Sequence, residues 1–318
     1  MKIMISWPIR PLAYELLNEH LGKHELIYPG SFDDDNLINL VKSTDVLIAG
    51  KAKASILVAG KRLSLVQSYI SGVGHIDIQQ AAQLRLPVAS AKGFNATSVA
   101  EHILMFFLYL IRSPFTRDQE IRQKIWIRDI DLEELSGKTL AIIGLGKVGS
   151  ELAKRAKAFD MKVMAIRRRP DLGDNYSKVD FLGGPDSIDF ILRQADFVSI
   201  NLPAVADTVG LFDKTRIQII KPGAILVNTS RGQILDQAGL YDALCNGHLR
   251  AAGLDVFSPE PPDASHPLFG LNNIIFSPHI AGRSRESEFR RAQFIAQNID
   301  ALEQGKQIIN LVDPELGY

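Results

Sequence analysis

The chain has 318 residues, which exceeds a typical single core of about 150 residues, so we expect two domains with a cleft between them. Lys and Arg together number 36, as do Asp and Glu, and this balance gives no overall field that would favour nucleic acid or an anionic membrane. The only cysteine, Cys245, excludes an internal disulfide framework and fits a reducing compartment. Small molecules are therefore the expected partners.

The opening sequence MKIMISWPIR lacks the apolar run and the cleavage site of a signal peptide, so we predict a cytoplasmic location. The longest apolar run covers residues 103–111, nine residues against the roughly 20 that a membrane-spanning helix needs. This run predicts a buried helix, and no membrane association is expected.

Strand-like and helix-like segments alternate in the first part of the chain. The strand-like segments are residues 3–5, 25–28, 46–49, 65–70 and 88–89, and the helix-like ones are residues 12–21, 36–41 and 78–84. This alternation predicts a parallel sheet with helices on both faces, in a unit that ends near Asn95.

Within this unit, the turn SGVGHID at residues 71–77 follows a predicted strand. Ligands of open α/β sheets bind at the carboxyl ends of strands, so the turn is a candidate binding loop. A plain strand-to-helix turn is the alternative. His75 is accordingly either catalytic or a solvated turn residue.

Residues 98–112 have the pattern of a long buried helix, with Ser98 as N-cap and Glu101 as its capping-box partner. We assign Glu101 and His102 to capping and to the helix dipole rather than to catalysis. The next segment, residues 117–131, mixes charges with apolar residues that include Trp126. It predicts either a subunit contact or packing within one chain.

The stretch LAIIGLGKVG, residues 140–149, combines a buried strand with the pattern G-x-G-x-x-G at Gly144, Gly146 and Gly149. Glycines alone indicate only a tight turn. Here a helix follows, because apolar residues recur at helical spacing over residues 148–159. Strand, loop and helix together predict a nucleotide site in which N–H groups at the helix start face phosphates.

A second strand is expected at residues 162–166, and the basic residues Arg167, Arg168 and Arg169 follow it directly. A site for NAD usually carries Asp or Glu about 20 residues past the loop, whereas arginine there binds the 2′-phosphate of NADP. A guanidinium offers forked, charge-assisted hydrogen bonds to that phosphate. The sequence therefore favours NADP(H), with NAD(H) and a merely solvated basic loop as the alternatives.

Four further strands are expected at residues 197–200, 224–228, 253–256 and 274–276, each followed by a polar loop. These loops and the glycine loop should emerge at one edge of the sheet. Arg231, Glu260 and His279 each lie in one of them, so the fold would bring the three together.

These three residue types suit the reduction of a 2-oxo acid. A histidine delivers or accepts a proton near neutral pH, and a neighbouring carboxylate stabilises its charged form. Arginine stays charged, so it pairs with a substrate carboxylate and polarises the adjacent carbonyl. No set of metal ligands is apparent in the sequence.

With these motifs in order, the chain resembles the D-2-hydroxyacid dehydrogenase family over nearly its whole length. GLGKVG matches the family's cofactor loop, NTSRG its arginine motif, GLDVFSPEPP its glutamate motif and SPHIAG its histidine motif. The resemblance implies two Rossmann-like doubly wound parallel-sheet domains, with the cofactor domain inserted into a flavodoxin-like substrate domain. Residues 1–97 and 285–318 would bind substrate, and residues 98–284 would bind the dinucleotide.

The resemblance also implies roles for individual residues. Arg231 would bind the oxo acid, Glu260 would be the partner of the histidine, and His279 would be the acid/base. The remaining implied contacts are Val73 and Gly74 with the substrate carboxylate, Lys147 and Val148 with the pyrophosphate, Leu202 and Pro203 with the adenosine, and Thr229, Asp255 and Gly282 near the nicotinamide.

The expected protein is an NADP(H)-preferring reductase of small 2-oxo acids such as glyoxylate and hydroxypyruvate, working as a homodimer by resemblance. A phosphoglycerate-type dehydrogenase using NAD and a non-catalytic cofactor sensor are the alternatives. Arg283 and Arg285 add positive charge after Gly282, either for a phosphorylated or dicarboxylic substrate or as a solvated helix start.

Overall fold

The computed structural model describes residues 1–170 and 179–314. Backbone contacts divide the chain into two compact units, unit 1 with residues Met1–Asn95 and Arg283–Tyr318, and unit 2 with residues Ala96–Gly282. The boundaries drawn from the sequence, near Thr97 and Ser284, lie slightly further along the chain. Unit 2 is thus inserted in the sequence of unit 1.

Unit 1 is built on a parallel sheet of five strands in the part of the chain that the structure describes. The order is β2 (Glu25–Ile27), β1 (Lys2–Ile5), β3 (Val46–Ala49), β4 (Leu65–Ser68) and β5 (Val88–Ala89). This is the flavodoxin-like order, in which the chain reverses direction across the sheet between β1 and β3.

Two apolar layers cover the sheet of unit 1. One consists of α1 (Pro11–Leu21) and α11 (Arg285–Glu303), and the other of α2 (Asp34–Val41), α3 (Ala54–Ala59) and α4 (Ile78–Gln83). Successive residues of β1 point to opposite layers, since Ile3 and Ile5 pack with α1 and α11 whereas Met4 packs with α2 and α3. The C-terminal segment of the chain therefore completes a core that the first residues begin.

Unit 2 contains a seven-stranded parallel sheet among its described residues. Its order is β12 (Ile274–Phe276), β11 (Ala251–Leu254), β10 (Ile225–Asn228), β9 (Phe197–Ile200), β6 (Thr139–Ile143), β7 (Lys162–Ile166) and β8 (Phe181–Gly183). This is the dinucleotide-binding order extended by one strand. The strand order reverses between β6 and β9, which puts the topological switch point at the glycine loop.

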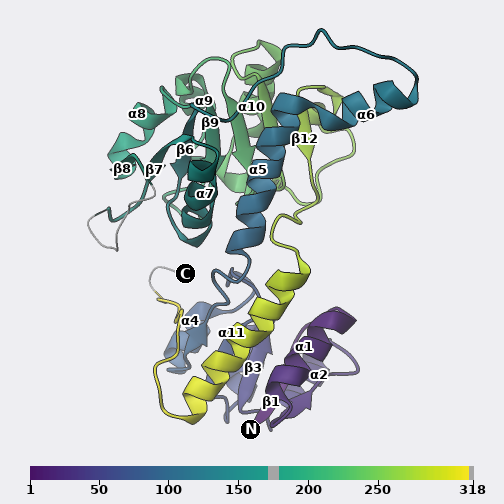
Figure 1. The fold of residues 1–318 in the computed structure, drawn as a ribbon. Coiled ribbons are helices and arrows are strands. Elements are labelled where there is room, and N and C mark those ends of the chain that lie inside the picture. Colours follow the sequence, from purple (N-terminus) through teal and green to yellow (C-terminus); the bar gives the residue numbers. More distant parts are fainter. Residues whose placement is uncertain (171–178, 315–318) are drawn as a thin grey trace. The chain divides into compact units, whose positions relative to one another are not determined.

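Helices cover both faces of this sheet (Figure 1). On one face α5 (Ala96–Arg112) lies beside α7 (Lys147–Ala158), and on the other lie α8 (Ile188–Leu192), α9 (Lys214–Ile219) and α10 (Gln237–Cys245). Short 3-10 turns occur at η1 (Pro185–Ser187), η2 (Gly232–Ile234) and η3 (Pro267–Gly270). The helix α6 (Pro114–Arg122) projects from the end of α5 (Figure 1).

The structure confirms the predicted α/β class with two doubly wound parallel sheets. One local prediction is wrong, because α5 begins at Ala96, so Ser98 lies inside the helix and is not its N-cap. Glu101 forms an ion pair with Arg155 of α7 at 3.0 Å. In residues 1–170 and 179–314, no helix is both long enough and apolar enough to span a bilayer.

Candidate active site

The three glycines of the loop after β6 differ in what surrounds them. Gly144 has φ +111°, and a Cβ there would lie 2.5 Å from the carbonyl oxygen of Asn201 after β9. A Cβ on Gly149 would lie 2.4 Å from the carbonyl oxygen of Gly144, which is how α7 packs closely on β6. Gly146 precedes α7 as its N-cap, and a Cβ there would meet no atom within 4 Å. The first and last glycines thus close the turn, and the middle one faces open space.

The helix α7 begins with Lys147 and Val148, directly after this open position. The first N–H groups of an α-helix have no partner within the helix, and the helix dipole adds partial positive charge there. The loop and helix start therefore offer donors for an anionic group such as a pyrophosphate.

The end of β7 lies against the same loop. The N–H groups of Gly144 and Leu145 donate to the carbonyl of Ile166, at 3.2 and 2.8 Å. Arg167 is the next residue, held by its own N–H bond to Gly183 at 3.0 Å. The guanidinium of Arg168 lies 3.5 Å from Asp207. The basic residues thus follow a strand end that is hydrogen bonded to the glycine loop.

Two further loops contribute to this edge of the sheet. Leu202 follows β9 and approaches Gly144, because its Cδ2 would lie 3.0 Å from a Cβ there, and Pro203 comes next. Thr229 follows β10 and is buried, and its Oγ1 has no hydrogen-bond partner within residues 1–170 and 179–314. A buried hydroxyl without a partner is costly, so it is a natural contact for a ligand. The open Gly146, the helix start and this hydroxyl together fit a bound dinucleotide.

His279 and Glu260, 19 residues apart in sequence, are hydrogen bonded in the structure. The Nδ1 of His279 lies 2.8 Å from the Oε2 of Glu260, and the other carboxylate oxygen accepts the N–H of Phe257 at 2.9 Å. Both side chains remain partly exposed, by 49% and 36%. Because Nδ1 is bonded to the carboxylate, Nε2 is the ring nitrogen left to exchange a proton with a ligand.

Burial acts to raise the pKa of Glu260, but its hydrogen bonds from His279 and Phe257 and the charges of His279 and Arg231 hold the pKa below the ordinary value for a glutamate. The carboxylate is therefore ionised at neutral pH and is suited to stabilise an imidazolium. This pair can hold a proton and release it to a bound ligand.

Arg231 is brought to this pair by the packing of its loop. A Cβ on the adjacent Gly232 would lie 2.0 Å from the carbonyl of Phe257, so only glycine allows the arginine loop to lie against the loop that leads to Glu260. Asn228, fully buried at the end of β10, shapes the loop by donating to the carbonyl of Arg231 at 3.0 Å. The structure thus brings together all three residues of the predicted set.

Asp255, which follows β11, is 1% exposed and faces the histidine loop. Its carboxylate accepts the hydroxyl of Ser277 and the N–H groups of Ile280 and Ala281, the last two at 2.8 and 2.9 Å. Gly282 follows and is the last residue of unit 2. Both oxygens of Asp255 are therefore engaged by the segment that carries His279.

Sequence reasoning did not single out Asn228 or Ser277. Both belong to the motifs NTSRG and SPHIAG, and their position beside the matched arginine and histidine was the available signal. The sequence favours a role in capping and the helix dipole for His102, yet its Nε2 lies 2.9 Å from the Oγ of Ser277. A contact between residues 175 positions apart cannot be seen in local spacing.

The expected substrate-loop residues Val73 and Gly74 belong to unit 1, between β4 and α4. Val73 is buried, and a Cβ on Gly74 would meet no atom within 4 Å. The Nε2 of His75 bonds the carbonyl of Ala49 at 3.0 Å, so this ring braces the turn against β3.

Arg283 and Arg285 lie in unit 1, next to the start of α11. Ser284 is the N-cap and forms a capping box with Ser287. Both arginines are exposed, as expected for a solvated helix start.

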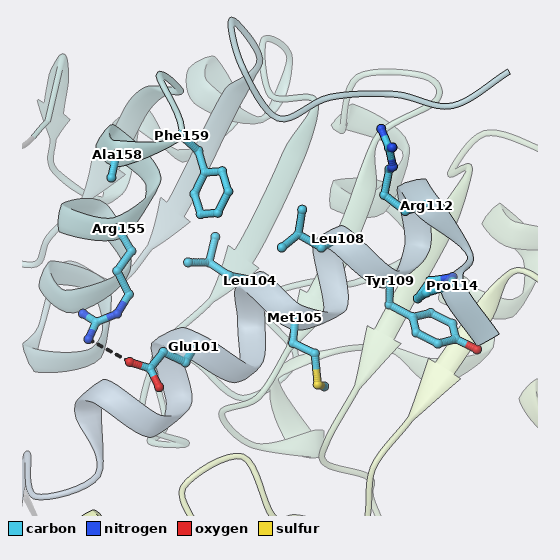
Figure 2. A pocket seen from close by; sticks show the side chains of 10 residues that line it. All are labelled: Glu101, Leu104, Met105, Leu108, Tyr109, Arg112, Pro114, Arg155, Ala158 and Phe159. Atoms are coloured by element: carbon cyan, nitrogen blue, oxygen red, sulfur yellow. Dashed lines mark hydrogen bonds and ion pairs between the residues drawn. The ribbon is translucent and has the colours of Figure 1, made fainter. Parts of the chain in front are cut away.

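Unit 2 also carries a hollow of about 670 Å³, and none of the candidate cofactor, substrate or catalytic residues lines it. It lies along α5 and α7, and Figure 2 shows apolar side chains of both helices facing it, with the Glu101–Arg155 ion pair at one end. We call it the α5/α7 groove, and its lining residues are Glu101, Leu104, Met105, Leu108, Tyr109, Arg112, Pro114, Arg155, Ala158 and Phe159.

Comparison with known proteins gives matches over most of the chain. The family model for the NAD binding domain of D-isomer specific 2-hydroxyacid dehydrogenases matches residues 104–281. A D-3-phosphoglycerate dehydrogenase of Archaeoglobus fulgidus is 32% identical over 98% of this chain, which spans only 59% of that relative. A hydroxypyruvate reductase of Thermotoga maritima is 32% identical over 91% of this chain and 94% of its own.

A solved structure of similar fold is that of a D-isomer specific 2-hydroxyacid dehydrogenase family protein from Aeromonas salmonicida. It has a TM-score of 0.83 and 27% identity, and the match covers 98% of this chain and 99% of that one.

Proposed function

Because this chain belongs to the D-isomer specific 2-hydroxyacid dehydrogenase family, we propose that it is an NADP(H)-preferring oxidoreductase that interconverts small 2-oxo acids and D-2-hydroxy acids. The observation that supports the proposal most directly is the 2.8 Å contact between His279 and Glu260, with the loop of Arg231 packed beside it. His279 would be the acid/base, Glu260 its carboxylate partner, and Arg231 the cation that binds the substrate carboxylate.

When bound, a nicotinamide cofactor would supply the hydride for the carbonyl carbon of the oxo acid. His279 gives the proton of Nε2 to the carbonyl oxygen, which becomes the hydroxyl, and Glu260 stabilises the imidazolium before transfer. Arg231 pairs with the substrate carboxylate and polarises the carbonyl. The N–H groups of Val73 and Gly74 would hold that carboxylate.

The preference for NADP(H) rests on the basic residues after β7. Arg167 directly follows the strand end to which the glycine loop is hydrogen bonded, so a 2′-phosphate at this end of the site would meet positive charge. Lys147 and Val148 are proposed to bind the pyrophosphate, Leu202 and Pro203 to line the adenosine, and Thr229, Asp255 and Gly282 to lie near the nicotinamide. NAD(H) is the alternative cofactor.

Glyoxylate and hydroxypyruvate are the proposed substrates, and a relative named hydroxypyruvate reductase, whose whole length this chain nearly spans, supports this choice. Phosphoglycerate oxidation is the second candidate because of the similarity to a D-3-phosphoglycerate dehydrogenase.

The proposed location of the protein is the cytoplasm. The lone Cys245 supports this proposal, because a single cysteine fits a reducing compartment.

We further propose a homodimer formed through unit 2. The segment of residues 113–134, which we call the arm, contains no buried residue, and Trp126 and Phe115 are 76% and 61% exposed. The α5/α7 groove adjoins it, because Pro114 lines the groove and begins α6. A two-fold axis would let the arm of each copy cover the groove of the other, since such an interface pairs the same surface on both subunits.

The experiment is a turnover assay of NADPH and NADH oxidation with glyoxylate, hydroxypyruvate and phosphohydroxypyruvate, and of 3-phosphoglycerate oxidation. We expect reduction of the first two with higher kcat/KM for NADPH. His279→Ala should lower kcat about 10²–10⁴-fold and still bind NADPH, because only proton transfer is lost. His248→Ala is the matched control, since this histidine bonds the carbonyl of Ile217 at 3.2 Å.

Higher activity with phosphohydroxypyruvate or 3-phosphoglycerate than with glyoxylate and hydroxypyruvate would show that the second candidate, phosphoglycerate oxidation, is the correct function. NADPH binding without turnover of any of these acids would favour a cofactor sensor. Normal turnover by His279→Ala would refute the acid/base role, and a preference for NADH would refute the role of Arg167.

A further inference from the structure

The helix α5 packs unusually closely on β11. A Cβ on Gly253 would lie 2.5 Å from the ring of Phe106, so the absence of a side chain there lets the phenyl ring reach the strand backbone. The imidazole of His102, one turn before Phe106, packs on that ring with 4.5 Å between ring centroids. This close packing fixes how far the imidazole of His102 lies from the end of β11.

From that position His102 reaches the loop after β12. Its Nε2 lies 2.9 Å from the Oγ of Ser277, whose hydroxyl donates to the Oδ1 of Asp255. A serine hydroxyl has one proton, and here the carboxylate accepts it. The Oγ of Ser277 is therefore the acceptor and the Nε2–H of His102 the donor. Both hydrogen bonds thus point from donor to acceptor in the direction of Asp255.

Burial lowers the pKa of His102, against the raising effect of the charge of Asp255. A neutral imidazole bearing its proton on Nε2 satisfies the geometry without adding a buried charge. The hydrogen bonds from His102 through Ser277 to Asp255 therefore fix the orientation of these three side chains.

The same chain fixes the backbone around His279. Asp255 accepts the N–H groups of Ile280 and Ala281, and its carbonyl accepts the N–H of His279 at 2.8 Å. His279 has φ +53°, in the left-handed region that a residue with a side chain rarely adopts. The hydrogen bonds to Asp255 therefore maintain the conformation in which Nδ1 of His279 meets Glu260.

We propose that His102 is a positioning residue for His279, which it holds toward Glu260 through Ser277 and Asp255. The inference rests on the proposed function, since it assigns a role in presenting the acid/base of that reaction. It gives α5, which carries no residue of the Arg231, Glu260 and His279 set, a part in building the site.

The kinetic test compares His102→Ala, His102→Gln and the control His248→Ala. His102→Ala should lower kcat about tenfold to a hundredfold, because a small misplacement of an acid/base costs that much, while NADPH affinity stays unchanged. The glutamine amide can donate from a similar position, so His102→Gln should recover most of the lost rate. The melting temperature of each variant separates misfolding from misplacement.

A double-mutant cycle tests the route through Ser277. Ser277→Ala should lower kcat to a similar extent, and the double variant with His102→Ala should be no slower than either single variant, because both break one chain. Independent, multiplying effects would overturn the proposal. So would a His102→Ala variant with the kcat of the His248→Ala control.

A second measurement does not depend on turnover. The Nδ1–H proton of His279, hydrogen bonded to Glu260, should give a downfield NMR signal that is absent in His279→Ala. We expect it to disappear in His102→Ala and to return in His102→Gln. An unchanged signal in His102→Ala would overturn the inference, whereas wild-type protein that is silent toward all tested acids, with this signal intact, would overturn the proposed function alone.

Discussion

The imidazole of His75 shows how one half-buried group links folding to pH. Burial lowers the pKa of His75, while the hydrogen bond to the carbonyl of Ala49 acts in the opposite direction. The ring is therefore neutral in the folded protein at pH values where an unfolded chain, with its ordinary value of 6.5, already takes up a proton. Acid should weaken unit 1 through this residue.

The sign of the effect follows from proton linkage. Well above pH 6.5 neither state binds a proton at His75, so the free energy of unfolding is constant with respect to this group. As the pH falls below 6.5, the unfolded state binds more protons than the folded state, and stability is lost until the folded pKa is passed. His75→Gln, which can still donate to Ala49, should therefore show a smaller drop in melting temperature between about pH 7 and pH 5.

Burial also lowers the pKa of His24 in unit 1, so the wild type and the variant share a background of acid loss. The difference between their two pH curves is the quantity that reports His75. Parallel curves would show that His75 titrates alike in the folded and unfolded states and would contradict the assignment.

At the scale of elements, substitutions at the junction of β6 and α7 can distinguish an effect on folding from an effect on cofactor binding. Gly149→Ala would place a Cβ 2.4 Å from the backbone oxygen of Gly144, so the helix must shift on the strand. We expect the free energy of unfolding to fall by about 1–3 kcal/mol, with cofactor affinity falling as well. Thermal unfolding and NADPH titration measure the two effects.

Gly146→Ala is the matched variant, because its φ of −94° suits any residue and its Cβ would meet no atom within 4 Å. Its melting temperature should stay near that of the wild type. NADPH binding should weaken about tenfold or more, a loss of about 1.4 kcal/mol for each factor of ten, because the methyl group fills the proposed place of the pyrophosphate. An unchanged NADPH affinity in Gly146→Ala would show that the cofactor does not bind against this loop.

The elements that could be predicted from the sequence are those with a simple apolar pattern. The central strands of unit 2 are buried on both faces, so residues such as 140–143 and 163–166 run apolar without alternation. The sequence predicts at most the start of α11, near Arg283 and Arg285, and not its extent, because its buried face mixes Ile295 and Ile299 with Glu288, Arg291 and Asn298. Those polar side chains are buried through partners such as Tyr69 and Gln67, which lie far away in the sequence.

The candidate site follows the same division. Arg231, Glu260 and His279 could be predicted because each follows a recognisable strand within a familiar motif. The contact of His102 could not, because it depends on how closely Phe106 approaches Gly253 when α5 packs on the sheet. Arg167, Arg168 and Arg169 are described, whereas residues 171–178 lie outside the described part of the chain.

For the whole molecule, the arm makes the assembly state a direct test of the proposed dimer. Trp126→Ser removes the most exposed aromatic side chain of the arm. We expect the dimer of this variant to dissociate at a higher protein concentration than the wild type, because a large apolar contact is lost. Phe190→Ser is the control, since Phe190 is 53% exposed on α8, outside the arm and the α5/α7 groove. Sedimentation velocity over a dilution series measures both variants.

A wild-type protein that is monomeric at every concentration would contradict the proposed assembly. Equal dissociation of the Trp126→Ser and Phe190→Ser variants would place the interface elsewhere.

The interrupted course of unit 1 also determines the order in which the protein can form on the ribosome. The first 95 residues supply every strand of the unit 1 sheet among the described residues, but part of one face, beside α1, waits for Ala292, Ile295, Ala296 and Ile299 of α11. Unit 2 is continuous from Ala96 to Gly282, so all of it is synthesised before that helix emerges. The nascent chain therefore completes the later unit first, while part of one sheet face of the earlier unit stays exposed to chaperones.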